Sequence, residues 1–401
     1  MAPAPAPTPL RDAGAGLVMR VLHVSDCYLP RLGGIEIHLR DLVQHQRAAG
    51  HESHLVTTTP PLAGAGDDPW VHRVDATSGP VGGLARADAA LRQLLADLSP
   101  DVVHVHVSVF SPFATIAARR AATAGVATLV TVHSMWSRLG PLPAAAHTLL
   151  RLGSWPVTWS AVSEPAAAPL RAMLGPGVPV HVLPNAIDTA SWRPRDLDGQ
   201  ALPRPATPTV VSVMRLTHTK RTLPLAAILR DVRRRLPTDQ PMRAVVIGDG
   251  PRRPALERYV RRHRMADWVE LHGRVDRAVV RQELSTASVF LAPAELESFG
   301  IAALEARAMG LPVVASSHSG VVEFVGHGTE GLLGPTDQAL AQHVTRLLTD
   351  TSLRTRIARH NALVPSRHDW AQALQLSDAA YAEAMSAGRP RLRRLAPVGA
   401  S

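Results

Sequence analysis

The stretch Glu297-Ser298-Phe299-Gly300-Ile301-Ala302-Ala303-Leu304-Glu305 places two glutamates eight residues apart, across a turn that leads into an apolar helix. The first N–H groups of a helix lack partners and lie at the positive end of its dipole, so they can bind a phosphate. Four residues could donate such backbone hydrogen bonds: Ser298, Phe299, Gly300 and Ile301. Glu305 could then accept hydrogen bonds from a ribose and Glu297 from a sugar. Taken alone, the pair could equally be a solvated acidic loop and a helix-surface glutamate.

Further segments accompany this stretch in a fixed order, and the ordered set is more specific than any single piece. Together they resemble the retaining family-4 glycosyltransferases of the GT-B fold, including bacterial phosphatidylinositol mannosyltransferases, over about residues 19–385. The segments that carry the resemblance, besides the two glutamates, are Tyr28 to Glu36, Val182 to Asp188, Arg215-Leu216 with Lys220, Ile247 to Pro251, and His272 to Val275.

The resemblance implies an α/β protein with two Rossmann-like domains that face each other across a cleft. A chain of 401 residues also exceeds one ordinary core, and its alternating apolar runs and amphipathic stretches are typical of parallel sheets. We expect a disordered leader (1–17), an acceptor domain (18–192), a linker (193–208), a nucleotide-sugar domain (209–369), a helix crossing back to the first domain (370–386) and a disordered basic tail (387–401).

Short apolar runs predict the strands of both domains. In the first domain they cover 20–25, 54–58, 101–107, 128–133, 159–163 and 180–183, and in the second 209–214, 243–247, 269–272, 289–292 and 312–315. The chain has no run of eighteen apolar residues, a single cysteine (Cys27), and no basic or apolar signal-peptide region at its start. We therefore expect a cytoplasmic protein without disulfides.

The net charge of +10 suggests an anionic partner. The arginines gather in two clusters, 230–235 and 252–264. An anionic membrane leaflet would attract such clusters, but arginines on solvated helix faces explain them equally well. Nucleic acid is disfavoured, because no recognition motif or interleaved aromatic residue accompanies the arginines.

The resemblance assigns the diphosphate to two cations. Arg215 and Lys220 follow the first strand of the second domain and would stabilise the departing diphosphate without a bound metal. Met214 and Arg221 depart from the family, which usually has glycine at both positions, so the loop could be narrower or carry a third cation. No cofactor is expected beyond the nucleotide sugar itself.

The remaining site residues also follow from the resemblance. His133 would contact the transferred sugar, Glu297 its hydroxyl groups, and Glu305 the ribose; the favoured mechanism is same-face substitution, in which the leaving phosphate takes the acceptor proton. The backbone around Arg274 and Val275 would read the base, Gly33 and Gly34 would let the diphosphate or acceptor approach, and Gly320, Val321 and Glu323 would line the rear of the pocket.

Two other motifs are weaker. His104 and His106 lie on one face of a predicted strand, and this spacing could suit a metal, but no third ligand is evident and packing is favoured. Gly248-Asp249-Gly250 lacks the third glycine of a dinucleotide-binding loop.

The acceptor is least defined. Residues 135–159 carry tryptophans and leucines beside Arg138 and Arg151, which suits a lipid surface but equally a core helix, and some relatives that act on lipid-linked inositol glycans share its His-Ser start. We expect a hexose transferred from GDP-mannose or a UDP-hexose to a hydroxyl acceptor, lipid-linked at the inner face of the plasma membrane or else soluble. The alternatives are a nucleotide-sugar epimerase of the same fold and a non-catalytic nucleotide-sugar-binding protein.

Overall fold

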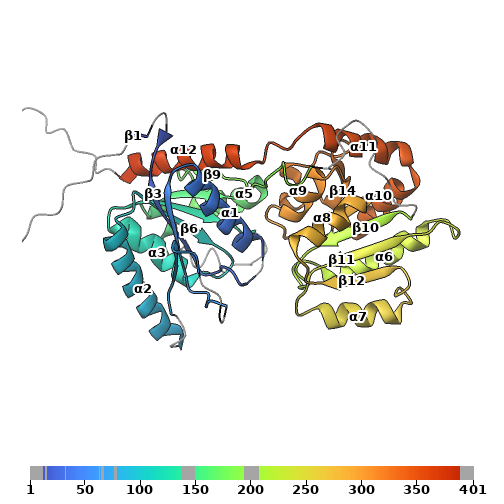
Figure 1. The fold of residues 1–401 in the computed structure, drawn as a ribbon, viewed down its shortest axis with the longest axis horizontal. Coiled ribbons are helices and arrows are strands. Elements are labelled where there is room, and N and C mark those ends of the chain that lie inside the picture. Colours follow the sequence, from blue (N-terminus) through green and yellow to red (C-terminus); the bar gives the residue numbers. More distant parts are fainter. Residues whose placement is uncertain are drawn as a thin grey trace, which may run out of the picture.

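The computed structural model describes residues 12–13, 16–31, 33–62, 64, 67–75, 79–136, 150–193 and 207–388. They form two parallel sheets, each covered by helices, that lie side by side (Figure 1). The two Rossmann-like halves are confirmed. Nearly all of the expected linker (193–208) and tail (387–401) lie outside the described residues. So does about half of the tryptophan-bearing segment 135–159.

The first half is built on a seven-stranded sheet in the order β5-β4-β3-β6-β7-β8-β9. Its strands are β3 (Arg20–Ser25), β4 (Glu52–Thr57), β5 (Val71–Arg73), β6 (Val102–Val107), β7 (Ala127–Val132), β8 (Thr158–Ala161) and β9 (Val180–Val182). The six predicted strands are confirmed to within two residues at each end. The sequence missed β5, a three-residue edge strand that is too short to form an apolar run.

Helices α1 (Gly34–Ala48), α2 (Gly79–Leu98), α3 (Pro112–Thr123) and α5 (Glu164–Leu174) cover this sheet. On α1 the buried apolar residues Leu39, Leu42 and Val43 share one face, as the periodicity predicted. The leader is not wholly without structure, because β1 (Asp12–Ala13) pairs antiparallel with β2 (Gly16–Leu17). Strands of two residues have no periodicity that a sequence could reveal.

The second half is built on a six-stranded sheet in the order β12-β11-β10-β13-β14-β15. Its strands are β10 (Thr209–Val213), β11 (Arg243–Ile247), β12 (Val269–Gly273), β13 (Val289–Ala292), β14 (Val313–Ser316) and β15 (Gly331–Gly334). The five predicted strands are confirmed, and β15 was missed because it holds only two apolar residues between glycines. The helices are α6 (Thr222–Arg235), α7 (Arg253–Arg262), α8 (Arg277–Thr286), α9 (Ile301–Ala308), η3 (Gly320–Glu323), α10 (Asp337–Thr349) and α11 (Thr351–Leu363).

The last helix, α12 (Trp370–Gly388), leaves the second half and lies across the first (Figure 1). Its Tyr381 and Ala384 are buried against Val102 and Leu129 of the first sheet. The predicted crossing is therefore confirmed. No helix in the described ranges is long and apolar enough to cross a membrane.

Candidate active site

The turn between the two glutamates is held tightly by its neighbours. Gly300 has φ of 95°, a left-handed conformation that favours glycine, and a Cβ there would lie 2.7 Å from Val321 Cγ2. A Cβ on Gly320 would lie 2.1 Å from the carbonyl oxygen of Ser298, so η3 packs directly against the turn. The ring of Phe299 is buried, so its side chain anchors the turn in the core.

The start of α9 carries backbone groups that an anion could use. Within the described ranges, the N–H groups of Ser298, Phe299 and Gly300 donate to no acceptor. They precede the helix at its positive end, as the sequence predicted for a phosphate site.

Lys220 and Glu297 are joined across the second half. Lys220 Nζ donates to Glu297 Oε2 at 2.6 Å, and both side chains are about a quarter exposed. Lys220 precedes α6 at the carboxyl end of β10, whereas Glu297 follows β13. The carboxyl ends of these neighbouring parallel strands therefore bring together the two residues expected at the phosphate and at the sugar.

Arg215 contacts the first half through Glu36, a residue of the segment Tyr28 to Glu36 for which no role was predicted. Its Nη2 lies 3.8 Å from Oε1 of Glu36, whose side chain is 3% exposed and also pairs with Arg31. A Cβ on Gly33 would lie 2.4 Å from Glu36 Oε2 and 2.9 Å from Arg215 Nη2. A side chain at position 33 would therefore displace the ends of Glu36 and Arg215, while a Cβ on Gly34 would make an ordinary contact, 3.7 Å from Ile301.

Glu305 is buried, so it is not the solvated helix-surface glutamate that the sequence left as an alternative. Its Oε1 lies 3.1 Å from Nη2 of Arg277, whose Nη1 lies 3.3 Å from Asp41 on α1. The guanidinium of Arg277 also lies over Trp192, 5.4 Å from the ring centre. Burial raises the pKa of Glu305 to about 7, although Arg277 acts in the opposite direction.

The sequence did not predict Arg277 and Asp41 as site residues, although both gave weak signals. Arg277 comes shortly after the loop expected to read the base, and Asp41 interrupts the apolar face of α1. Their pairing bridges the two halves, and no local pattern encodes such a contact.

His133 lies against the turn of α9. Its carbonyl oxygen accepts a hydrogen bond of 2.6 Å from Ser298 Oγ, which joins the end of β7 to the second half. Its ring is buried, and this burial, together with neighbouring His38, lowers the pKa to about 3. At neutral pH the imidazole is therefore uncharged.

Some expected residues are placed differently. Arg221, the possible third cation, pairs with Asp337 and Glu295. Glu323 reaches the first half, where its carboxylate accepts from the N–H of Glu164 at the start of α5, so it caps a helix. Arg274 is exposed and Val275 half-buried.

The glycines of the Gly248-Asp249-Gly250 loop serve a close backbone approach rather than a dinucleotide. A Cβ on Gly248 would lie 1.9 Å from the Met214 carbonyl oxygen, and one on Gly250 would lie 2.5 Å from the Leu216 carbonyl oxygen. The loop therefore packs against the segment that carries Arg215.

Of the three tryptophans in residues 135–159, one is buried and two are half-buried. Trp159 is buried in β8, a strand flanked on both sides, and Trp136 and Trp155 pack against the same core. Trp155 Nε1 donates to the Leu150 carbonyl. Trp159 therefore belongs to the core, whereas Trp136 and Trp155 are half-buried, and for these two the interfacial interpretation stays a prediction. Leu139, Leu142 and Leu149 lie outside the described residues. A more exposed apolar side chain lies in the loop after β6, where Phe110 is 81% exposed.

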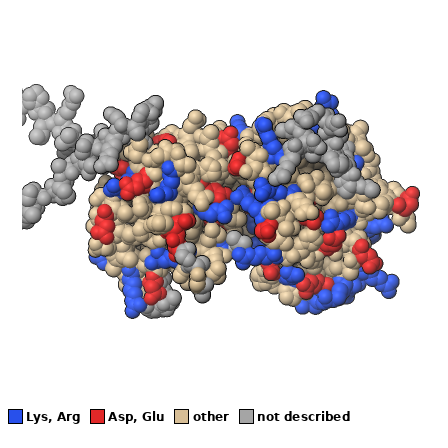
Figure 2. Space-filling view, viewed as in Figure 1, with Lys and Arg blue, Asp and Glu red and all other residues tan. Residues whose placement is uncertain are grey.

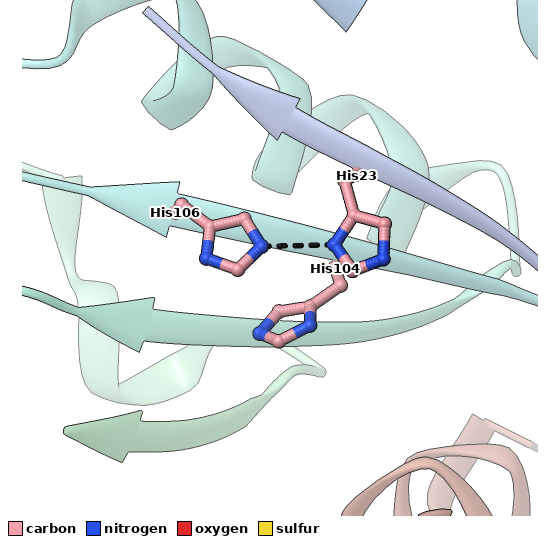
Figure 3. Close-up of side chains that lie close together, drawn as sticks. All are labelled: His23, His104 and His106. Carbon is pink, nitrogen blue, oxygen red and sulfur yellow. Dashed lines mark hydrogen bonds between the residues drawn. The ribbon is translucent and has the colours of Figure 1, made fainter. Parts of the chain in front are cut away.

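The histidine pair is part of a larger buried cluster. His23 on β3 joins His104 and His106, and nitrogen atoms of the three rings lie within 4.8 Å of one another (Figure 3). The third candidate ligand therefore exists. However, both nitrogens of each ring already take part in hydrogen bonds, with partners Gln46, Tyr381, Thr131, His133 and each other. The packing interpretation fits these contacts better than a metal site does.

Charges of both signs meet where the two halves approach each other. Figure 2 shows Lys and Arg side chains from both halves along this junction, with acidic side chains among them. The ion pairs of Arg215, Lys220 and Arg277 are the local form of this pattern. An anion that enters this junction can pair with the cations in place of the carboxylates.

Comparisons with known proteins agree with this geometry. A model described as Glycosyltransferase Family 4 matches residues 32–191, and one described as Glycosyl transferases group 1 matches residues 196–363. The chain is 28% identical to a component of the phosphatidylinositol N-acetylglucosaminyltransferase of Arabidopsis thaliana, over 94% of this chain and 85% of that protein. It is 29% identical to the GDP-mannose-dependent alpha-(1-6)-phosphatidylinositol monomannoside mannosyltransferase of Mycobacterium tuberculosis, over 82% of this chain and 89% of that protein.

Solved structures share the fold. The structure of Anabaena HepE in complex with UDP and glucose superposes with a TM-score of 0.72 at 18% identity, covering 91% of this chain and all of that one (100%). Sucrose-phosphate synthase of Thermosynechococcus elongatus gives 0.72 at 20% identity, covering 92% of this chain and 100% of that one. The chain therefore belongs to the glycosyltransferases of group 1 and family 4, and it has the GT-B fold.

Proposed function

We propose that this protein is a retaining, metal-independent hexosyltransferase that moves a hexose from GDP-mannose or a UDP-hexose to a hydroxyl acceptor. The observation that carries the proposal is that Lys220 pairs with Glu297 just before the N-terminus of α9, while Arg215 reaches Glu36 beside Gly33 and Gly34, the latter facing Ile301 of α9. The cations and backbone N–H groups supply positive charge where a diphosphate would depart. Glu297 supplies a carboxylate that can accept hydrogen bonds from the sugar hydroxyls. A lipid-linked acceptor is proposed because both phosphatidylinositol glycosyltransferases named above cover most of the chain.

Each residue has a defined role in this reaction. Lys220 and Arg215 stabilise the charge that develops on the leaving diphosphate, and the N–H groups of Ser298 to Ile301 bind its oxygens. Glu297 and His133 orient the sugar, and Glu305 accepts from the ribose hydroxyls. The acceptor hydroxyl attacks on the face that the diphosphate leaves, and the departing phosphate oxygen takes its proton, which retains the configuration.

The carboxylates of the site must change partners when the donor binds. Lys220 is held by Glu297 and Arg277 by Glu305, so an entering diphosphate competes for the lysine and a ribose competes at Glu305. Because the bound nucleotide replaces ion pairs between groups that are already placed, little reorganisation is needed.

The donor can be identified by thermal shift. We expect one class of nucleotide, UDP or GDP, to raise the melting temperature by roughly 5–10 °C at a hundredfold excess over its Kd, because binding then stabilises the fold by about 2.7 kcal/mol. The shift and the subsequent transfer should persist in excess EDTA, since cations and helix N–H groups take the place of a metal. Strict dependence on Mg²⁺ or Mn²⁺, restored by re-addition, would contradict the proposal.

The membrane part of the proposal predicts weak, reversible binding to anionic vesicles. Exposed arginines on and after α7 (Arg258, Arg261, Arg262 and Arg264) and the exposed Phe110 motivate it. Each basic residue near an anionic leaflet contributes about 1 kcal/mol, and salt screens this attraction. We expect sedimentation with phosphatidylserine vesicles at low salt, and little with phosphatidylcholine or at high salt.

A pair of variants localises the contact. Phe110→Ser should weaken vesicle binding several-fold, whereas Leu363→Ser, which removes an apolar side chain of similar exposure (63%) on α11 of the other half, should not. Indifference to lipid charge would remove the electrostatic argument, and a soluble acceptor would then be favoured.

A further inference from the structure

A continuous chain of buried polar groups runs through the first half beneath α12. It consists of eight hydrogen bonds of 2.6–3.2 Å that connect, in order, the Val130 carbonyl, Ser160, Thr131, His104, Tyr381, Gln46, His23, His106 and His133. The chain starts inside the sheet, passes through a residue of the crossing helix and ends at the candidate active site.

The direction of the first hydrogen bonds is fixed by a carbonyl, which can only accept. Ser160 Oγ must donate to the Val130 carbonyl at 3.2 Å, so its oxygen accepts the proton of Thr131 at 2.6 Å. Thr131 in turn accepts from His104 Nε2 at 2.7 Å. Each hydroxyl has one proton, so no other assignment satisfies all three contacts.

The same direction continues through α12. A neutral imidazole that donates from Nε2 accepts at Nδ1, so His104 Nδ1 takes the proton of the Tyr381 hydroxyl at 2.8 Å. The Tyr381 oxygen then accepts from the amide nitrogen of Gln46 at 2.9 Å. This contact orients the amide: Gln46 Oε1 faces the other way, where it accepts from Ser53 Oγ at 2.9 Å.

Gln46 then sets the tautomers of three histidines in succession. His23 donates from Nε2 to Gln46 Oε1 at 2.7 Å and accepts at Nδ1 from His106 Nε2 at 3.0 Å, the contact drawn in Figure 3. His106 therefore accepts at Nδ1 from His133 Nε2, at 2.9 Å. Among the residues that the structure describes, none forms a hydrogen bond with Nδ1 of His133.

We propose that this chain fixes the tautomer of His133, with the proton on Nε2 and the lone pair of Nδ1 presented to a hydroxyl group of the transferred sugar. The sugar contact rests on the proposed function, whereas the tautomer does not. Tyr381 and Gln46 are then positioning residues for His133, although Tyr381 belongs to a helix that enters from the other half of the molecule.

The protonation states agree with this direction. Burial lowers the pKa of His23 to about 4, and those of His104 and His106 fall well below the usual value for the same reason, which neighbouring histidines reinforce. Each ring thus carries one proton at neutral pH, as a chain with a single direction requires. A flipped Gln46 would reverse every bond and would leave Ser160 with one proton for two acceptors.

The direct test is the tautomer itself. Ring ¹⁵N shifts of protein labelled at histidine, with His133 assigned by its loss in His133→Gln, distinguish a protonated from an unprotonated nitrogen at pH 7.5. We expect Nε2 of His133 to be protonated and Nδ1 to be bare. A proton on Nδ1, a doubly protonated ring, or a stoichiometric transition metal on His23, His104 and His106 would overturn the proposal.

Variants far from the site test the transmission. Tyr381→Phe removes only the hydroxyl that orients Gln46, so both amide orientations become accessible and His133 should show comparable populations of both tautomers. Thr131→Val should have the same effect from the opposite end of the chain. Ser53→Ala is the matched control, because it removes a hydrogen bond to the same Gln46 without affecting its direction.

Kinetics provide a separate readout. In Tyr381→Phe and Thr131→Val we expect turnover to fall roughly two- to tenfold, the range for weakening one neutral hydrogen bond, with unchanged affinity for the bare nucleoside diphosphate. Ser53→Ala should retain turnover. If the His133 spectrum is unchanged in both variants, Tyr381 and Thr131 do not set the tautomer of His133, and the proposal is wrong. If His133 has the expected tautomer but the protein transfers no sugar, the hydrogen-bond chain is supported and the proposed function is refuted.

Discussion

Lowering the pH from 7 to 5 is expected to destabilise the first half of the molecule strongly. Five histidines are buried around the polar chain, and burial lowers the pKa of His23 and His38 to about 4, of His133 to about 3, and those of His104 and His106 well below the usual 6.5. Between these values and 6.5 the unfolded chain binds protons that the folded chain does not. Stability is therefore full above pH 6.5 and falls as the pH drops below it.

The magnitude is large compared with the stability of a domain. At pH 5 each of the three histidines whose folded pKa is about 3–4 (His23, His38 and His133) costs about 2 kcal/mol, so together they cost roughly 6 kcal/mol, comparable with the free energy of unfolding of a marginally stable domain. His104 and His106 act in the same direction. Glu305 acts in the opposite direction, because its folded pKa of about 7 lies above the usual 4.5. Between pH 7 and 5 Glu305 raises the free energy of unfolding by only about 2 kcal/mol, so the histidines determine the sign of the overall change.

Urea unfolding followed by tryptophan fluorescence at several pH values measures this slope. His38→Gln should lower the slope between pH 5 and 6 by about one proton, or about 1.4 kcal/mol per pH unit. His218→Gln, at an exposed position before α6, should leave the slope unchanged. Stability that does not vary between pH 7 and 5 would mean that the cluster is hydrated or charged.

The sequence predicted those parts of the fold that local patterns encode. The central strands are rich in apolar residues because both of their faces are covered, and all of them were found. The edge strands β5 and β15 have few apolar residues and were missed. Gly300 marked its turn because only a residue without a Cβ fits beside Val321 at positive φ.

The site was predicted less completely, since much of it is made by contacts between the halves. The spacing of Glu297 and Glu305 is local, and so was found. The partners of the site, Glu36 and the pair Asp41–Arg277, depend on how α1 meets the second half. Likewise, the i, i+2 spacing of His104 and His106 was visible, but Tyr381 is 277 residues from His104 in the sequence and only the path of α12 brings it there.

Removing the Lys220 amine is expected to slow sugar transfer roughly 30- to 1,000-fold, because one charge-assisted contact to a departing phosphate is worth about 2–4 kcal/mol in the transition state. In Lys220→Ala the Glu297 carboxylate, which Lys220 Nζ approaches to 2.6 Å, would also lose this cation and repel the diphosphate. Nucleoside diphosphate affinity should therefore fall together with turnover. Single-turnover transfer and calorimetric titration with the bare nucleoside diphosphate measure the two effects separately.

Two further variants separate charge loss from repulsion. Glu297→Gln alone should lower turnover while nearly retaining nucleoside diphosphate affinity, since its partner is the sugar. Adding it to Lys220→Ala should restore part of the lost affinity but none of the rate, so the two changes should not be additive. Arg221→Ala is the matched control: it removes the adjacent cation, which is held by Asp337 and Glu295, and should reduce stability rather than turnover. Wild-type transfer by Lys220→Ala would show that the diphosphate lies elsewhere.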